Sequence, residues 1–102
     1  MVRKDKTSNS IEIAKNVIRN IKENGFDSHC FIEQYAHDYE FEYLQDLLYY
    51  ARAKKIFKTC HSQIALFLSA HQTEIGICKI KMSKKSKSIF GNKVPNEVWR
   101  KN

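Results

Sequence analysis

Apolar residues recur at helical spacing in the first part of the chain, and this spacing restricts the fold more than any other feature. In residues 9–24 the apolar positions fall three or four residues apart, which places them on one face of a helix. These positions are Ile11, Ala14, Val17, Ile18 and Ile21. Asn9 can cap such a helix at its start, and Gly25 can end it. We therefore predict a first helix over residues 9–24, preceded by a flexible basic tail over residues 1–8.

A second and a third helix are expected to follow. Asp27 or Ser28 can accept hydrogen bonds from the free N–H groups at the start of the second helix. Residues 38–43 alternate between polar and apolar side chains, which also suits a strand. We favour a bend near Tyr39 and a third helix that runs to about Ala53. The apolar residues at helical spacing in this third helix are Leu44, Leu47, Leu48 and Ala51.

A fourth helix is predicted over residues 58–71, after a basic break over residues 52–55. One of its faces is apolar, and we expect that face to be buried. The residues of the apolar face are Phe57, Cys60, Ile64, Phe67, Leu68 and His71. The opposite face carries short polar side chains, namely Thr59, Ser62, Gln63 and Ser69.

Near the C-terminus the period changes from that of a helix to that of a strand. Three apolar side chains alternate with lysines and are predicted to form the buried side of a strand; they are Cys78, Ile80 and Met82. A polar loop over residues 83–88 and a turn over residues 90–92 are expected next. Residues 98–100 fit a returning strand, whereas residues 94–97 fit the start of a short helix. The predicted fold class is mainly α with a small C-terminal β-hairpin.

Length and cysteine content limit the kind of protein that this chain can be. A chain of 102 residues has no room for a second core, so residues 9–102 are treated as a single compact domain. It has no run of about 20 apolar residues, and its charged start is not typical of a signal peptide. Three cysteines, an odd number, favour free thiols over a disulfide framework. We expect a cytoplasmic protein, without a membrane partner, whose three thiols are buried.

Charge is segregated along the sequence. Residues 27–51 contain six acidic side chains and no lysine or arginine, whereas residues 52–102 contain twelve basic side chains and two acidic ones. Residues 1–26 carry six basic and three acidic side chains, and the net charge of the whole chain is +7. A domain with one strongly positive half has the electrostatic character of a nucleic-acid-binding protein.

The positive charge is densest between residues 79 and 87. The lysines of this segment are Lys79, Lys81, Lys84, Lys85 and Lys87. Flexible lysine side chains can displace counterions from a phosphate backbone, so the segment is a candidate for contact with nucleic acid. The alternative is that these lysines only aid solubility and protect a strand edge from aggregation.

The order of the predicted elements is similar to that of winged-helix DNA-binding domains, in which helices precede a basic hairpin. The resemblance implies that the last helix lies in the major groove and that the hairpin touches the flanking backbone. In this chain Gln63 would then pair with an adenine edge, while Lys58, Thr59 and Ser62 would hold phosphates. The break before this helix lacks the glycine often found in a helix-turn-helix.

Metal binding and catalysis have little support in the sequence. Cys30 and His37 are seven residues apart, wider than the spacing of most structural zinc ligands. Cys60 lies on the predicted buried face of its helix, where a thiol is poorly reactive. The chain has three glycines and no glycine-rich phosphate loop. We predict no catalytic residue, no metal site and no cofactor.

The acidic segment supports an alternative function, a small protein-interaction module. If the leucines of the third helix face inward, Tyr49 and Tyr50 cannot both be buried beside them. Exposed tyrosines among acidic residues suit a protein interface better than DNA. The candidate contact residues are Tyr49, Tyr50, Glu40 and Glu42, and the partner is an unidentified protein or a second copy of the chain.

The sequence therefore leaves three hypotheses about function. Two of them involve a binding partner, and the third explains the segregated charge without a partner. The leading hypothesis is a non-enzymatic nucleic-acid-binding protein, with duplex DNA as the favoured ligand. The second is the interaction module. In the third, the acidic segment lies against the basic one and cancels its field.

Overall fold

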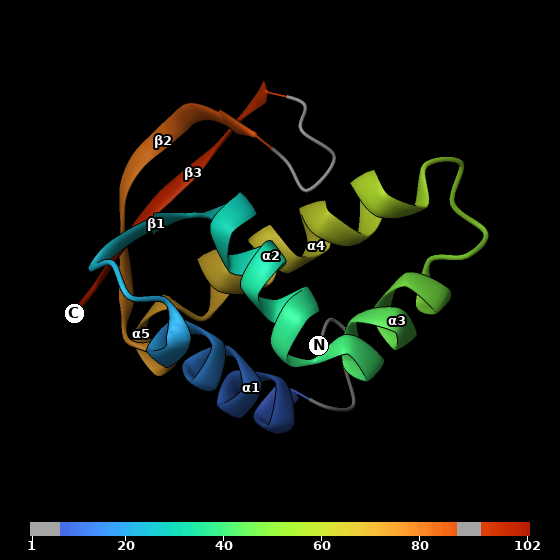
Figure 1. Ribbon diagram of the computed structural model, residues 1–102, viewed down its shortest axis with the longest axis horizontal. Helices are drawn as coiled ribbons and strands as arrows, with labels where there is room; N and C mark the ends of the chain where they lie inside the picture. Colours follow the sequence, from blue (N-terminus) through green and yellow to red (C-terminus); the bar gives the residue numbers. More distant parts are fainter. Residues whose placement is uncertain (1–6, 88–92) are drawn as a thin grey trace.

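Helices make up most of the protein, and a small three-stranded antiparallel sheet is built mainly from its C-terminal residues (Figure 1). The computed structural model describes residues 7–87 and 93–102, with the backbone alone for residues 7–8 and 81–96. The elements are α1 (Thr7–Asn20), β1 (Gly25–Asp27), α2 (Ser28–Asp38), α3 (Glu40–Tyr49), α4 (Ile56–Ala70), α5 (Gln72–Ile75), β2 (Ile77–Lys87) and β3 (Lys93–Lys101). The predicted fold class is confirmed. Within the described residues, no helix is both long and apolar enough to cross a membrane.

The apolar stripes of the sequence predict the presence of α2, α3 and α4. The third helix was expected to run to about Ala53, but α3 ends at Tyr49. Three residues of its predicted stripe are exposed, namely Leu44, Leu48 and Ala51. The predicted bend at Tyr39 separates α2 from α3, because this residue leaves the helical conformation with φ −132° and ψ 59°. The alternative of a strand over residues 38–43 is wrong. α4 buries three of the residues predicted for its apolar face, namely Cys60, Ile64 and Leu68.

The buried face of α4 is shorter than predicted. Phe57 is 43% exposed, and Phe67 and His71 are half-buried. Full burial begins at Cys60, so the first turn of α4 lies outside the core. Phe57 packs there against the ring of His61, with the two ring centroids 6.0 Å apart.

Asp27 caps α2, as one of the two predicted cap residues. Its Oδ1 accepts a hydrogen bond of 2.8 Å from the backbone N–H of Cys30. The backbone of Asp27 is extended, which is the usual conformation of an N-cap residue. β1 therefore ends at Asp27, and α2 begins at the next residue, Ser28.

We expect Asp27→Ala to lower the free energy of unfolding by about 1 kcal/mol, because an N–H at the start of α2 loses its acceptor. Asp27→Asn keeps an acceptor oxygen and should lie within a few tenths of a kcal/mol of the native chain. Urea denaturation followed by circular dichroism measures both variants. An equal loss in the two variants would show that the charge of Asp27, and not the cap, is what matters.

α1 differs from the predicted first helix at both ends. It begins at Thr7, so Asn9 lies inside the helix and does not cap it. Of the predicted flexible tail, residues 1–6 lie outside the described residues, and residues 7 and 8 form the start of α1. α1 ends at Asn20, before Gly25, which belongs to β1. The helix stops early because the chain must turn and extend to reach the sheet.

The sheet has the strand order β1-β3-β2, so the last strand of the chain lies at its centre. β2 and β3 form the predicted hairpin. β1 was not expected from the sequence, and it pairs antiparallel to β3 with Phe26 opposite Trp99. This pairing buries both rings, with Phe26 5% and Trp99 0% exposed.

The hairpin is longer than predicted. β2 continues to Lys87, so the loop expected over residues 83–88 is wrong for all but its last residue, which lies outside the described residues. The expected turn over residues 90–92 also lies outside them. β3 includes residues 94–97, so the alternative of a short helix there is wrong. The backbone ladder accounts for this length, since it extends to the pair formed by Lys87 and Lys93.

At the start of β2, over residues 77–80, the buried side is the opposite of the predicted one, and the side chain of Met82 lies outside the described residues. Ile77 is 2% exposed, whereas Ile80, which was expected to be buried, is 52% exposed. Lys79 lies on the inner side, with its Nζ 5.5 Å from the centre of the Trp99 ring. Register shifts on either side of Lys81 interrupt the alternation.

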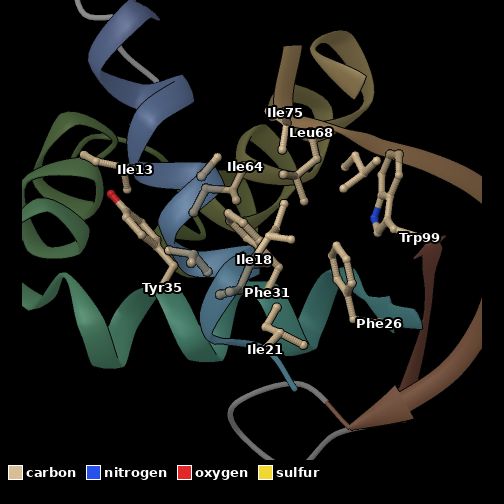
Figure 2. Close-up of a cluster of buried hydrophobic side chains, with 14 of the residues drawn as sticks. Ile13, Ile18, Ile21, Phe26, Phe31, Tyr35, Ile64, Leu68, Ile75 and Trp99 are labelled. Carbon is tan, nitrogen blue, oxygen red and sulfur yellow. The ribbon is translucent and has the colours of Figure 1, made fainter. Parts of the chain in front are cut away.

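The core lies between the helices and the sheet, as Figure 2 shows. Phe26 and Trp99 form its sheet side, and Ile18, Phe31 and Ile64 lie at its centre. The indole Nε1 of Trp99 donates a hydrogen bond of 3.1 Å to the Oγ of Ser28, which is also buried. This bond ties the central strand of the sheet to the first residue of α2.

Candidate nucleic-acid interface

The N-terminal half of α4 presents a polar outer face. Lys58, Ser62 and Gln63 are exposed, and Thr59 is half-buried at the edge of this face. Lys58 and Ser62 are four residues apart, as are Thr59 and Gln63, so the four side chains are neighbours on the helix surface. The structure thus brings together the four residues that the sequence predicted for groove contact.

Positive charge surrounds the start of this face. Arg52, Lys54 and Lys55, in the connection between α3 and α4, are all exposed. Among the described residues, none of these three cations or Lys58 forms an ion pair. The sequence reasoning treated residues 52–55 only as a break between helices and did not include them in the candidate site. Their position directly before a polar helix was the signal that could have identified them.

The start of α4 also lacks a side-chain cap. Lys55 occupies the N-cap position, and its side chain makes no capping hydrogen bond. The start of α4 therefore lies directly beside Lys54 and Lys55 in the sequence. Backbone N–H groups and the helix dipole at such an end both favour anions.

Of the five lysines predicted for the hairpin contact, the structure describes the side chain of Lys79 and the backbone of the other four. Lys79 is not a free cation, because its Nζ lies 3.5 Å from the Glu97 carboxylate and over the Trp99 ring. The backbone of the other four lies in β2, and their side chains lie outside the described residues. These four are Lys81, Lys84, Lys85 and Lys87.

The two parts of the predicted interface lie on separate elements. α4 leads into α5 and β2 from its C-terminal end, whereas residues 58–63 lie about 15 Å further back along its axis. Figure 1 shows the start of β2, next to α5, at one end of the molecule and the α3–α4 connection at the other, while the distal part of β2 curves over toward the middle. The two parts therefore belong to different elements, and a ligand that contacts both must extend from α4 to β2.

The predicted protein-contact residues all belong to α3 or its C-terminal end. Glu40 is exposed and Glu42 half-buried, while Tyr49 is 56% exposed and Tyr50 half-buried. The rings of Tyr49 and Tyr50 meet edge to face, with their centroids 5.0 Å apart. The leucines of α3 do not all face inward, because Leu44 and Leu48 are exposed and only Leu47 packs against the core.

A buried polar network holds α3 against the neighbouring helices. Tyr35 of α2 donates a hydrogen bond of 2.5 Å to the carboxylate of Asp46, which is fully buried. The Oη of Tyr43 lies 2.6 Å from Nε2 of His61 on α4. Burial raises the pKa of Tyr43 to about 12 and lowers that of His61. The network therefore joins the inner face of α3 to α2 through Asp46 and to α4 through Tyr43.

The three cysteines are free thiols, but only one is buried as predicted. Cys60 is fully buried, whereas Cys30 and Cys78 are half-buried. Burial raises the pKa of Cys60 to about 12, and the nearby Asp46 carboxylate adds to this effect. A thiol with such a pKa stays protonated at neutral pH and is a poor nucleophile. In the described part of the chain, no three His, Cys, Asp or Glu side chains gather closely enough to hold a metal ion.

Comparison with protein-family models, with curated proteins and with solved structures gave no match to this chain.

Proposed function

We propose that this protein binds nucleic acid without catalysing a reaction, and that its favoured ligand is duplex DNA. The observation that carries the proposal is the outer face of α4, where Lys58, Ser62 and Gln63 are exposed beside the cations of residues 52–55. Cations supply the sequence-independent attraction to phosphates. An exposed glutamine on a helix can form two hydrogen bonds with an adenine edge in the major groove.

The order of the elements supports a winged-helix-like use of this face. α1, α2 and α4 precede the β2–β3 hairpin, as the helices precede the hairpin in winged-helix domains. In that arrangement the N-terminal part of the last long helix contacts base edges. This is the half of α4 on which the polar residues lie.

The hairpin lysines extend the proposed contact along the DNA. The longest dimension of the molecule is 35 Å. A duplex rises about 3.4 Å per base pair, so about ten base pairs would match this length. A duplex is thus the kind of extended ligand that could meet both α4 and the lysines of β2.

Cancellation of the basic half by the acidic segment is disfavoured at the site. Lys54, Lys55 and Lys58 are exposed, and none of them contacts a carboxylate among the described residues. Their charge is therefore available to a ligand.

The three free thiols fit a reducing compartment, and we place the protein in the cytoplasm as part of the same proposal.

Fluorescence anisotropy of a labelled random-sequence duplex, titrated with protein at several salt concentrations, tests the proposal. We expect the logarithm of the binding constant to fall linearly with the logarithm of the salt concentration. The triple variant Lys54→Glu, Lys55→Glu, Lys58→Glu should bind more than about tenfold more weakly and reduce the slope by about 3. Lys84→Glu, Lys85→Glu and Lys87→Glu together should act in the same direction.

A control with the same change in charge separates local contact from net charge. The triple variant Lys15→Glu, Arg19→Glu, Lys22→Glu alters three cations in and just after α1. It should retain a slope close to that of the native chain. Equal weakening by the α1 and α4 variants would contradict the proposed site. The absence of native binding at about 50 mM salt would contradict the function itself.

A further inference from the structure

The outer face of α3 carries an apolar stripe that stays exposed in the described part of the chain. Phe41, Leu44 and Leu48 are 66%, 52% and 64% exposed. They occur at positions i, i+3 and i+7 of the helix, so they form one stripe along it. Tyr49, 56% exposed, extends the apolar surface at the C-terminal end of α3. A stripe of this kind on the surface of a domain usually marks an interaction site.

α3 is held firmly against the core, so the exposure of this stripe does not result from a loosely packed helix. The inner face of α3 is fixed by the hydrogen bond between Tyr35 and Asp46 and by the contact between Tyr43 and His61. Leu47 and Tyr50 also pack against the core from this inner side. α3 therefore has two apolar faces, and the core uses only one of them.

The charges at the two ends of α3 indicate what covers the outer face. Glu40 and Glu42 lie in the first turn of the helix. Arg52, Lys54 and Lys55 follow its last residue and are exposed. If two copies of α3 pack antiparallel, the acidic end of each helix lies beside the basic end of the other. A parallel pair would instead bring like charges together, which is unfavourable.

We propose that the protein forms a homodimer in which two α3 helices pack antiparallel across a two-fold axis. Such an interface uses the same surface patch on both copies, and the patch must be complementary to itself. The α3 surface meets this condition: its apolar stripe lies between charges of opposite sign. Phe41 of one copy would pack against Leu48 of the other, with Leu44 near the axis. The proposed dimer shares Arg52, Lys54 and Lys55 with the proposed nucleic-acid site, so the dimer is tested in the absence of nucleic acid.

Sedimentation equilibrium of the full chain without nucleic acid, over a wide range of protein concentrations, tests the proposal. We expect a species of twice the 12.0 kDa chain mass. Leu44→Glu places two carboxylates near the axis and should raise the dissociation constant about 100-fold or more. Leucine and glutamate have similar helix propensities, and Leu44 is exposed, so the fold should be retained. Leu66→Glu is the matched control, because Leu66 is 58% exposed but lies on α4.

A charge exchange tests the antiparallel arrangement. Glu40→Lys and Arg52→Glu should each weaken the dimer, and the two changes in one chain should restore it. A native chain that remains monomeric at every concentration would overturn the proposal and leave α3 to a different protein partner. Equal weakening by Leu44→Glu and Leu66→Glu would overturn the assigned face, and a double exchange that fails to restore the dimer would overturn the antiparallel pairing.

Discussion

Trp99→Ala is expected to lower the free energy of unfolding by about 3–5 kcal/mol, the usual cost of deleting a buried aromatic side chain. Trp99 is fully buried in the central strand of the sheet, and its indole N–H bonds to Ser28. A domain of this size is stable by only about 5–15 kcal/mol. The melting temperature should therefore fall by about 15 °C or more, as measured by circular dichroism.

Two further variants separate the packing of Trp99 from its hydrogen bond. Trp99→Phe keeps most of the apolar ring and loses the donor, so its cost should be smaller than that of alanine. Ser28→Ala should add almost nothing in the Trp99→Phe background, because the bond between the two residues is already lost. Leu66→Ala, at a 58% exposed position, should change stability by about 0.5 kcal/mol at most. A Trp99→Ala variant as stable as Leu66→Ala would contradict the burial of Trp99.

The helices could be predicted because their signals are local. The stripes of α2, α3 and α4 arise from residues three and four apart. α2 and α4 bury most of the stripe that they form, whereas α3 leaves Leu44 and Leu48 exposed. The break at Tyr39 and the cap at Asp27 are also local, since they depend on neighbours within a few residues. Sequence reasoning identifies such features without knowledge of distant contacts.

The sheet was predicted less well because its register depends on distant residues. β1 has only three residues, too few to show a period, and it exists because Phe26 packs opposite Trp99. On β2, the pairing of Lys79 with the buried Trp99 of β3 places Lys79 on the inner side and leaves Ile80 facing outward. A shift of one residue reverses every side chain in a strand, and a short sequence pattern does not reveal it.

Only part of the candidate site could be predicted, again because some of its features depend on residues far away in the sequence. The polar face of α4 follows from its helical period, and the structure confirms that Lys58, Ser62 and Gln63 are exposed. In α3 the period alone does not determine which apolar face is inside. One face holds Tyr43 and Leu47, and the other holds Leu44 and Leu48. The partners that decide between them, on α2 and α4, are not visible in the sequence of α3.

Alkaline pH should destabilise the protein strongly, because buried acids keep their protons in the folded state. Burial raises the pKa of Cys60 from its ordinary value of 9.0 to about 12, with a further contribution from Asp46. Between these pH values the unfolded chain has lost a proton that the folded chain still holds. Stability is then lost as pH rises, by about 1.4 kcal/mol per pH unit for one group.

Two tyrosines act in the same direction above pH 10. Burial raises the pKa of Tyr43 to about 12. The pKa of Tyr35 is raised well above its usual range, first by burial and then by its hydrogen bond to Asp46. Because the folded pKa exceeds the unfolded one in each case, their stabilising contribution is complete below pH 10 and is lost above it. The pH dependence should therefore become steeper there.

The pH dependence of urea denaturation, measured below and above pH 9, tests this origin. From Cys60 alone, the free energy of unfolding should fall by about 4 kcal/mol between pH 9 and 12. Cys60→Ala also leaves a small cavity. The cavity lowers the free energy of unfolding by the same amount at every pH, so the cavity by itself does not change how steeply stability falls with pH. The decisive quantity is therefore the slope above pH 9, which should become shallower by about 1.4 kcal/mol per pH unit in this variant. An unchanged slope would mean that Cys60 does not retain its proton in the folded state. The thiol would then be less enclosed than the complete burial of Cys60 indicates.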